Sequence, residues 1–103
     1  MIRENVKTYI VNIRDLSFKS EQIVVDLTRY LAEQLPQIEI IRNGIELEVH
    51  MPEKMSKRVI RHRIRKFLYK KALNEEFRPI SLNDGNKDGY FVKEKKQIQL
   101  TYY

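Results

Sequence analysis

Residues 37–50 read QIEIIRNGIELEVH and carry the clearest local signal in the chain. Apolar and polar side chains alternate on both sides of Asn43-Gly44, and this pair suits the positive φ angles of a type I′ turn. The pattern predicts a β-hairpin with a two-residue loop, in which Ile40 lies opposite Leu47. The buried face of this hairpin then consists of Ile38, Ile40, Leu47 and Val49.

The opposite face of the predicted hairpin places Ile41 across from Glu46 and Glu39 across from Glu48. Like charges that face each other across strands cost about 0.2–1 kcal/mol. Two interpretations follow, a cation or metal site and two solvated carboxylates on an open sheet face. We favour the solvated carboxylates.

The segments before the hairpin predict one strand and one helix. Residues 7–13 (KTYIVNI) are rich in β-formers and predict a strand. A helix over 21–35 follows, capped by Ser17 or Ser20, and it ends before Pro36 because the residue preceding proline resists helical geometry. Its apolar stripe comprises Ile23, Val24, Leu27, Tyr30, Leu31 and Leu35.

A second amphipathic helix is predicted after the hairpin, from Ser56 as N-cap to Leu73 or Asn74. Spacing of 100° per residue separates it into two faces. The apolar stripe, which must dock on the sheet, comprises Ile60, Ile64, Phe67 and Leu68. The opposite arc and its flanks carry Arg58, Arg61, His62, Arg63, Arg65, Lys66, Tyr69 and Lys70.

The C-terminal third predicts further strands. Residues 77–82 read as a strand in which Pro79 favours an edge position. Residues 83–89 have turn chemistry throughout, and 90–92 and 97–103 supply one or two more strands. The order β-α-β-β-α-β-β predicts an α+β fold, a two-layer sandwich of two helices on a mostly antiparallel sheet, in a single domain over 1–103.

Positive charge is concentrated in one segment of this chain. Residues 54–74 hold nine of the 20 Lys and Arg residues and no Asp or Glu, within a net charge of +6. Residues 1–53 carry six positive and nine negative side chains, and residues 75–103 carry five of each. A cationic element on a nearly neutral body is typical of a protein that binds a polyanion.

The residue inventory argues against enzymatic chemistry. There is no cysteine, and the two histidines, His50 and His62, lie far apart in the sequence. Gly44, Gly85 and Gly89 all stand in turn-like contexts, so no phosphate-binding glycine loop is expected. We therefore expect no enzyme, no cofactor, no metal site and no small-molecule substrate. The chain also lacks a membrane-length apolar run and a signal-peptide core, which predicts a cytoplasmic protein.

Arginines lead the candidate polyanion-binding residues because a guanidinium can donate two hydrogen bonds to one phosphate. Arg58, Arg61 and Arg65 come first, followed by Lys57, Lys66 and Lys70. His62 either contacts a phosphate or base or is simply solvated. Tyr69 either stacks on an exposed base or covers an arginine stem. A membrane surface is a weaker partner, because the apolar stripe is needed for the core.

Several short motifs cluster between positions 55 and 78: Met55-Ser56-Lys57-Arg58, the basic-basic-aromatic-Leu run Arg65-Lys66-Phe67-Leu68, the pair Lys70-Lys71, and Phe77-Arg78 at the next strand. In these motifs the chain resembles the eukaryotic-type ribosomal protein L twenty-two family of the large ribosomal subunit. Residues 99–103 resemble its final strand. The acidic tail of many members is absent, and residues 83–96 are longer than the family's tight final turn.

The resemblance implies a non-catalytic α+β domain that binds ribosomal RNA beside neighbouring ribosomal proteins. It assigns RNA contacts to Lys57, Arg58, Arg65, Lys66, Lys70 and Lys71. The charge argument alone adds Arg61, His62 and Arg63. Two alternatives stay open, a DNA-binding or nucleoid-associated module and an adaptor for an acidic protein partner.

Overall fold

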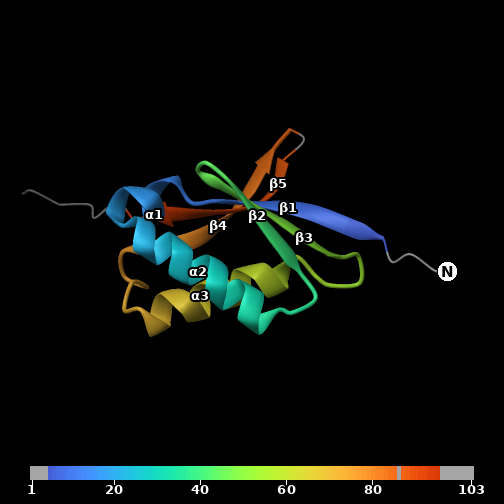
Figure 1. Ribbon diagram of the computed structural model, residues 1–103. Helices are drawn as coiled ribbons and strands as arrows, with labels where there is room; N and C mark the ends of the chain where they lie inside the picture. Colours follow the sequence, from blue (N-terminus) through green and yellow to red (C-terminus); the bar gives the residue numbers. More distant parts are fainter. Residues whose placement is uncertain (1–4, 86, 96–103) are drawn as a thin grey trace, which may run out of the picture.

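A five-stranded sheet with helices packed against it forms the fold (Figure 1). The computed structural model of the chain describes residues 5–85 and 87–95. Its elements are β1 (Val6–Asn12), α1 (Arg14–Lys19), α2 (Glu21–Gln34), β2 (Glu39–Asn43), β3 (Glu46–Pro52), α3 (Arg58–Lys70), β4 (Phe77–Asp84) and β5 (Lys87–Glu94). The predicted α+β class is confirmed.

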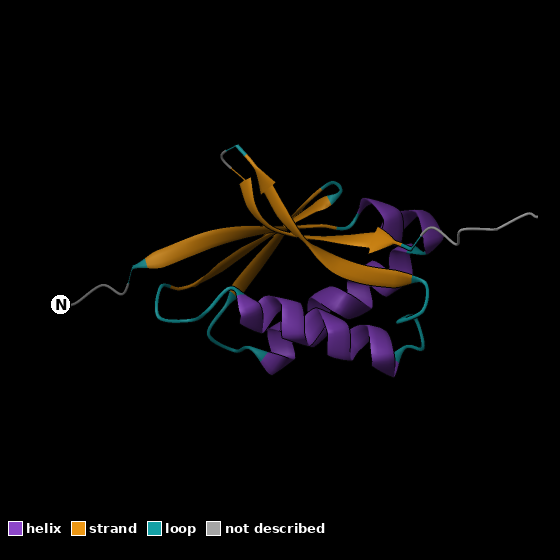
Figure 2. Ribbon diagram, turned by 180° about the vertical axis from the view of Figure 1, so that it is seen from behind, coloured by secondary structure: helices purple, strands orange, loops and turns teal. Residues whose placement is uncertain are grey.

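The strand order across the sheet is β2-β3-β1-β5-β4. β1 lies at the centre, antiparallel to β3 and parallel to β5, while the β2–β3 and β4–β5 pairs are antiparallel. The long helices α2 and α3 lie on the same side of the sheet (Figure 2). β4 is an edge strand, as the proline at position 79 predicted, since proline cannot donate to a ladder on both sides.

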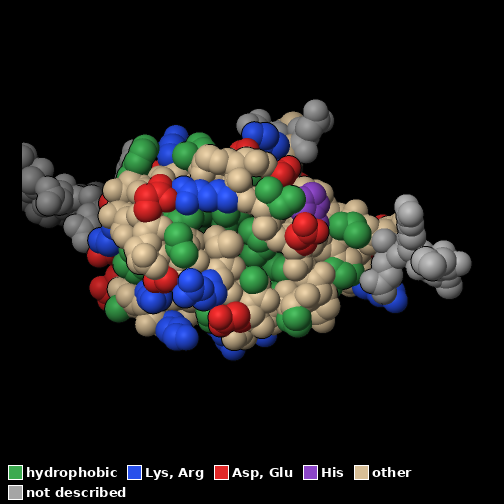
Figure 3. Space-filling view, viewed as in Figure 1, with side chains coloured by type: hydrophobic (Ala, Val, Ile, Leu, Met, Phe, Trp, Pro, Cys, Tyr) green, Lys and Arg blue, Asp and Glu red, His purple; other side chains and the backbone are tan. Residues whose placement is uncertain are grey.

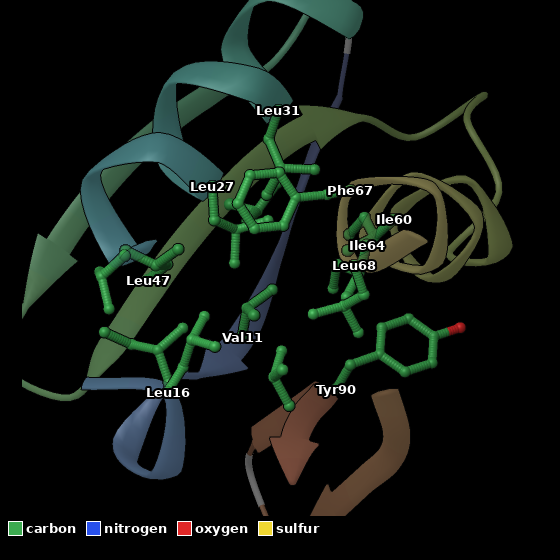
Figure 4. Packing of buried hydrophobic residues seen from close by; sticks show 14 of the residues in the cluster. Val11, Leu16, Leu27, Leu31, Leu47, Ile60, Ile64, Phe67, Leu68 and Tyr90 are labelled. Carbon is green, nitrogen blue, oxygen red and sulfur yellow. The ribbon is translucent and has the colours of Figure 1, made fainter. Parts of the chain in front are cut away.

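The core lies between the sheet and the two long helices. From α3 it takes the whole predicted stripe, Ile60, Ile64, Phe67 and Leu68, none of which is more than 1% exposed. α2 contributes Val24, Leu27 and Leu31, and the central strands contribute side chains such as Val11 and Leu47 (Figure 4). Burial of these stripes fixes the rotation of each helix about its axis, and so decides which residues face outward.

Helix α1 was not predicted from the sequence. It has six residues and buries only Leu16, so it is too short to produce a helical periodicity. Ile13 occupies its N-cap position, and the Arg14 N–H donates to Asn12 Oδ1 at 2.9 Å. Ser17 lies inside this helix and donates to the Arg14 carbonyl, so its predicted role as cap of the next helix is wrong. Ser20 occupies the N-cap position of α2 but makes no side-chain capping bond.

The β2–β3 hairpin has a different register from the predicted one. The two loop residues are Gly44 and Ile45, and Asn43 belongs to β2 and pairs with Glu46. Only Gly44 has a positive φ (61°), which is the pattern of a type II′ turn with glycine first. Backbone contact with the rest of the fold supports this turn, because the Ile13 N–H donates to the Ile45 carbonyl at 2.7 Å.

The shifted hairpin keeps the predicted faces but changes the partners. Ile40 pairs with Val49, and Glu39 pairs with His50 instead of Glu48. A shift of two residues leaves every side chain on its original face, so Leu47 and Val49 are still fully buried. The expected repulsion between Glu39 and Glu48 across the strands is absent. Glu48 instead accepts a 2.7 Å hydrogen bond from the Asn43 side chain.

Helix α3 is shorter than predicted at both ends. It begins at Arg58, so the N-cap position is Lys57 and the prediction of Ser56 as N-cap is wrong. The Ser56 hydroxyl nevertheless accepts a 3.2 Å hydrogen bond from the Arg58 N–H. It ends at Lys70 because Ala72 adopts a left-handed conformation with φ of 59°. The Leu73 N–H donates to the Leu68 carbonyl and the Ala72 N–H to the Tyr69 carbonyl. These two bonds form a Schellman motif, in which glycine is the usual residue at the left-handed position.

We expect Ala72→Gly to stabilise the domain. A residue with a Cβ costs roughly 1–2 kcal/mol of folding free energy in the left-handed conformation, and glycine removes this cost. Part of the gain is lost, because glycine also gives the unfolded chain more conformational entropy. The expected gain is about 0.5–1 kcal/mol, or a Tm rise of roughly 2–8 °C in a thermal melt. Ala32→Gly, in the exposed part of α2, should instead lower stability by about 1 kcal/mol. A Tm for Ala72→Gly at or below the parent's would contradict the assignment of this cap.

The C-terminal strands are longer than predicted. Residues 83, 84 and 87–89, expected in a turn, belong to β4 and β5, and Asp84 pairs with Lys87 at the end of the hairpin. Gly89 is therefore a strand residue, not a turn residue. It pairs with Ile10 where β1 and β5 run side by side. The strand predicted over 97–103 lies outside the described residues.

Candidate nucleic-acid interface

Helix α3 presents its basic arc away from the core. Its four buried residues anchor it on the sheet, and the outer side chains are exposed: Arg58, Arg61, His62, Arg65, Lys66 and Tyr69. With 13 residues and a rise of about 1.5 Å each, the helix is roughly 20 Å long. Tyr69 is 68% exposed, which is unusual for a large aromatic ring.

The exposed cations of α3 have no acidic partner within residues 5–85 and 87–95. No ion pair joins Arg58, Arg61, Arg65 or Lys66 to a carboxylate, whereas ion pairs are frequent elsewhere. In the view of Figure 3 the two charge types mix over α2, and Lys and Arg side chains continue along the lower rim where α3 lies. Because these cations lack internal counterions, their field acts on the surroundings.

Lys57 does not belong to this free group. Its Nζ lies 2.6 Å from Asp88 Oδ1 and 3.2 Å from Ser81 Oγ, and 4.9 Å from the centre of the Tyr90 ring. Its side chain is only 23% exposed. Lys57 therefore makes structural contacts that tie the start of α3 to β4 and β5, and its RNA contact stays a prediction.

Lys71 and Lys70 also have interaction partners within the fold. The Lys71 amine lies 3.2 Å from Asp26 Oδ2. Hydrogen bonds from Gln22 and then from Lys71 hold the pKa of Asp26 below its usual value. The Lys70 amine lies 5.7 Å from the centre of the Tyr30 ring. Both lysines are exposed and remain within reach of a ligand, but they face α2 rather than the free arc.

Arg63, predicted as a flank of the basic face, is turned toward α2. It donates to Gln34 Oε1 at 3.2 Å, and its Nε is buried without a hydrogen-bond partner. The structure therefore separates the predicted residues into two groups. The first group points to solvent, and we call it the α3 outer face: Arg58, Arg61, His62, Arg65, Lys66 and Tyr69. Lys57, Arg63, Lys70 and Lys71 have partners in the fold.

A groove between α3 and the edge strand β4 adjoins the α3 outer face. It encloses about 640 Å³. Its lining includes Arg58, Arg61, Arg65, Tyr69, Asn74, Glu75, Arg78, Pro79, Ser81, Tyr90 and Lys95. Among the lining residues that were absent from the sequence-based candidates, Arg78, Tyr90 and Lys95 could contact a polyanion. Nothing local marks them, although Arg78 lies four positions after the end of the basic segment and is the second residue of β4.

The remaining candidate chemistry is not assembled. No group of three or more His, Asp and Glu side chains that could hold a metal ion occurs within the described residues. His50 forms a 3.0 Å hydrogen bond with the Thr8 hydroxyl on the sheet, far in sequence from His62. Among the described helices, none is both long and apolar enough to cross a membrane.

Comparisons with known proteins add no family assignment. No family model matches the chain, and no curated protein matches it at a significant level. The functional argument therefore rests on the residues and their arrangement.

Proposed function

We propose that this chain is a structural RNA-binding protein of the large ribosomal subunit, acting without enzymatic activity in the cytoplasm. The observation that carries the proposal is the α3 outer face, where Arg58, Arg61, Arg65 and Lys66 lie together without an acidic partner in the described part of the chain. Repulsion among cations three and four residues apart disfavours a helix. A polyanion removes that repulsion.

The geometry of α3 suits contact with a folded RNA backbone. The buried stripe holds the helix on the sheet, so the arginines are displayed on a rigid support of roughly 20 Å. Guanidinium groups bind phosphates through paired hydrogen bonds. Such contacts position a protein on RNA without reading a long sequence, which suits a structural role beside other ribosomal proteins.

The family resemblance supports the proposal through the motifs of residues 55–78. Residues 83–96 are longer than the tight final turn of the ribosomal protein L twenty-two family, and residues 99–103, which resemble its final strand, lie outside the described residues. The resemblance assigns RNA contacts to Lys57, Lys70 and Lys71 as well, and the internal partners of these lysines favour a smaller role for them.

The ribosomal proposal is tested by sedimentation of the native protein in a lysate of its own cells. We expect it to migrate with large ribosomal subunits and to stay with them through a high-salt wash, because an integral protein is held by RNA on several sides. Recovery in light fractions or with chromatin would overturn the ribosomal assignment.

The RNA-binding proposal is tested separately by salt dependence and competition. We expect about five phosphates to be neutralised, by Arg58, Arg61, Arg65, Lys66 and Arg78. This number predicts that a plot of log affinity against log salt concentration has a slope of roughly −3.5 to −4.5. Structured RNA should displace duplex DNA at matched salt. Preference for duplex DNA would indicate a DNA-binding module. A slope near zero, or affinity no higher than that of a generic protein of equal charge, would instead favour an acidic protein partner.

A further inference from the structure

We infer that the groove between α3 and β4 binds one unpaired nucleotide of the RNA, an inference that rests on the proposed function and specifies its ligand. The groove encloses about 640 Å³, within the range of small-ligand sites and matched to a nucleotide rather than to a double helix. It opens beside the α3 outer face, so an RNA held there by its backbone can place a flipped-out nucleotide into it.

Charge along the groove favours a phosphodiester. Arg58, Arg61 and Arg65 line it from α3, and Arg78 lines it from β4. Glu75 is the one acidic residue of the lining, against five cations when Lys95 is included. An arginine-rich lining with a strong positive excess binds a phosphate group by paired hydrogen bonds and repels a metal cation.

Tyr90 provides the second, independent feature of the site. The residue is 5% exposed, and its hydroxyl oxygen is not among the buried polar atoms of the described residues, so it reaches solvent. Figure 4 shows the ring at the border of the core, with the oxygen pointing away from the buried cluster. The hydroxyl has no hydrogen-bond partner among the described residues and is therefore available to a ligand in the groove that Tyr90 lines.

Tyr69 supplies an aromatic surface at the same groove. It is exposed and lines the groove together with Tyr90. Unpaired bases in RNA are commonly held by stacking on tyrosine and by hydrogen bonds to their edges. We therefore assign the phosphate to the arginines, base stacking to Tyr69 and a base-edge or sugar contact to the Tyr90 hydroxyl.

An added peptide strand is a poorer occupant of this groove. β4 is an edge strand, and edge strands accept further strands through their backbone groups. Pro79 interrupts the edge because it has no N–H to donate, and Ser81 is tied by its hydroxyl to Lys57. An acidic peptide could use the charge of the groove but would form an incomplete ladder.

The test compares two RNA hairpins with the same stem, one fully paired and one with a single bulged 2-aminopurine nucleotide. We expect the parent protein to bind the bulged RNA about tenfold more tightly and to change the fluorescence of the probe by stacking. Tyr90→Phe removes only the hydroxyl and should reduce this preference about three- to tenfold, with no change for the paired RNA. Tyr69→Ala should reduce both the preference and the fluorescence change.

Tyr30→Phe is the matched control, because it removes the same hydroxyl group from a residue of α2. Tyr30 packs against Phe67 and lies outside the groove. It should behave like the parent. Equal affinity of the parent for both RNAs, or identical behaviour of Tyr90→Phe and Tyr30→Phe, would overturn the nucleotide site while leaving the RNA-binding function intact. Failure of the parent to bind either RNA would overturn both. An effect of Tyr90→Phe on an acidic peptide but not on RNA would assign the groove to a protein partner.

Discussion

Replacing Arg58, Arg65 and Lys66 together with alanine should lower the affinity for structured RNA about a hundredfold. All three side chains are exposed on the α3 outer face and lack acidic partners within the described residues. A contact between a surface cation and an anion contributes up to about 1 kcal/mol, so three lost contacts approach 3 kcal/mol, or two powers of ten. The salt slope should fall in magnitude by roughly 2–3 at the same time.

The fold should survive this triple change. Alanine has the highest helix propensity, and the substitutions also remove repulsion between neighbouring cations of α3. We expect the free energy of unfolding to stay within about 1 kcal/mol of the parent value, measured by denaturant titration. Loss of RNA binding with an intact unfolding transition then locates the interface on α3.

A second triple variant provides the control for net charge. Lys7→Ala, Lys19→Ala and Lys93→Ala remove three positive charges from β1, α1 and β5, at residues that neither belong to α3 nor line the groove. Within the described part of the chain, the one ion pair of these lysines joins Lys19 to Glu76, both of them exposed, and such pairs contribute little. We expect a loss of less than about tenfold in RNA affinity. Equal losses in the two triple variants would show that total charge, and not the α3 outer face, determines binding.

Gly89→Ala should be the most destabilising single substitution of a small residue in this fold. A Cβ at position 89 would stand 1.8 Å from the Ile10 carbonyl oxygen and 2.7 Å from two other backbone atoms of Ile10. Because these atoms belong to the backbone of the neighbouring central strand, no side-chain rotation relieves the clash. The β1–β5 ladder must separate, which we expect to cost about 3 kcal/mol or more and to lower Tm by at least roughly 12 °C.

The other two glycines test this explanation directly. Gly44 and Gly85 have positive φ angles of 61° and 58°, and a Cβ at either position meets no atom within 4 Å. Gly44→Ala and Gly85→Ala should therefore cost only about 1–2 kcal/mol from backbone strain. If thermal melts give all three alanine variants the same Tm, the close approach of β1 and β5 does not explain the need for glycine at position 89.

The candidate site could be predicted from the sequence only in part. Local charge located α3, and its periodicity separated Arg58, Arg65 and Lys66 from the buried stripe. The internal partners of Lys57 and Lys71 could not be predicted, because Asp88 and Asp26 lie 31 and 45 positions away in the sequence. Tyr90 was read only as a strand residue. Its place at the groove depends on the pairing of β4 with β5 and on how α3 crosses them.

The sequence by itself determined the features that depend on neighbours a few residues apart. Helical and strand periodicities identified the buried faces of α2, α3 and the β2–β3 hairpin, and the charge count located the basic helix. The tertiary structure alone decided the strand order with β1 at the centre, the hairpin register, the short helix α1 and the choice of free and paired cations. The physical reason is that these features arise from contacts between distant segments. A two-residue register shift preserves every face, so the pattern of the sequence is equally consistent with either pairing.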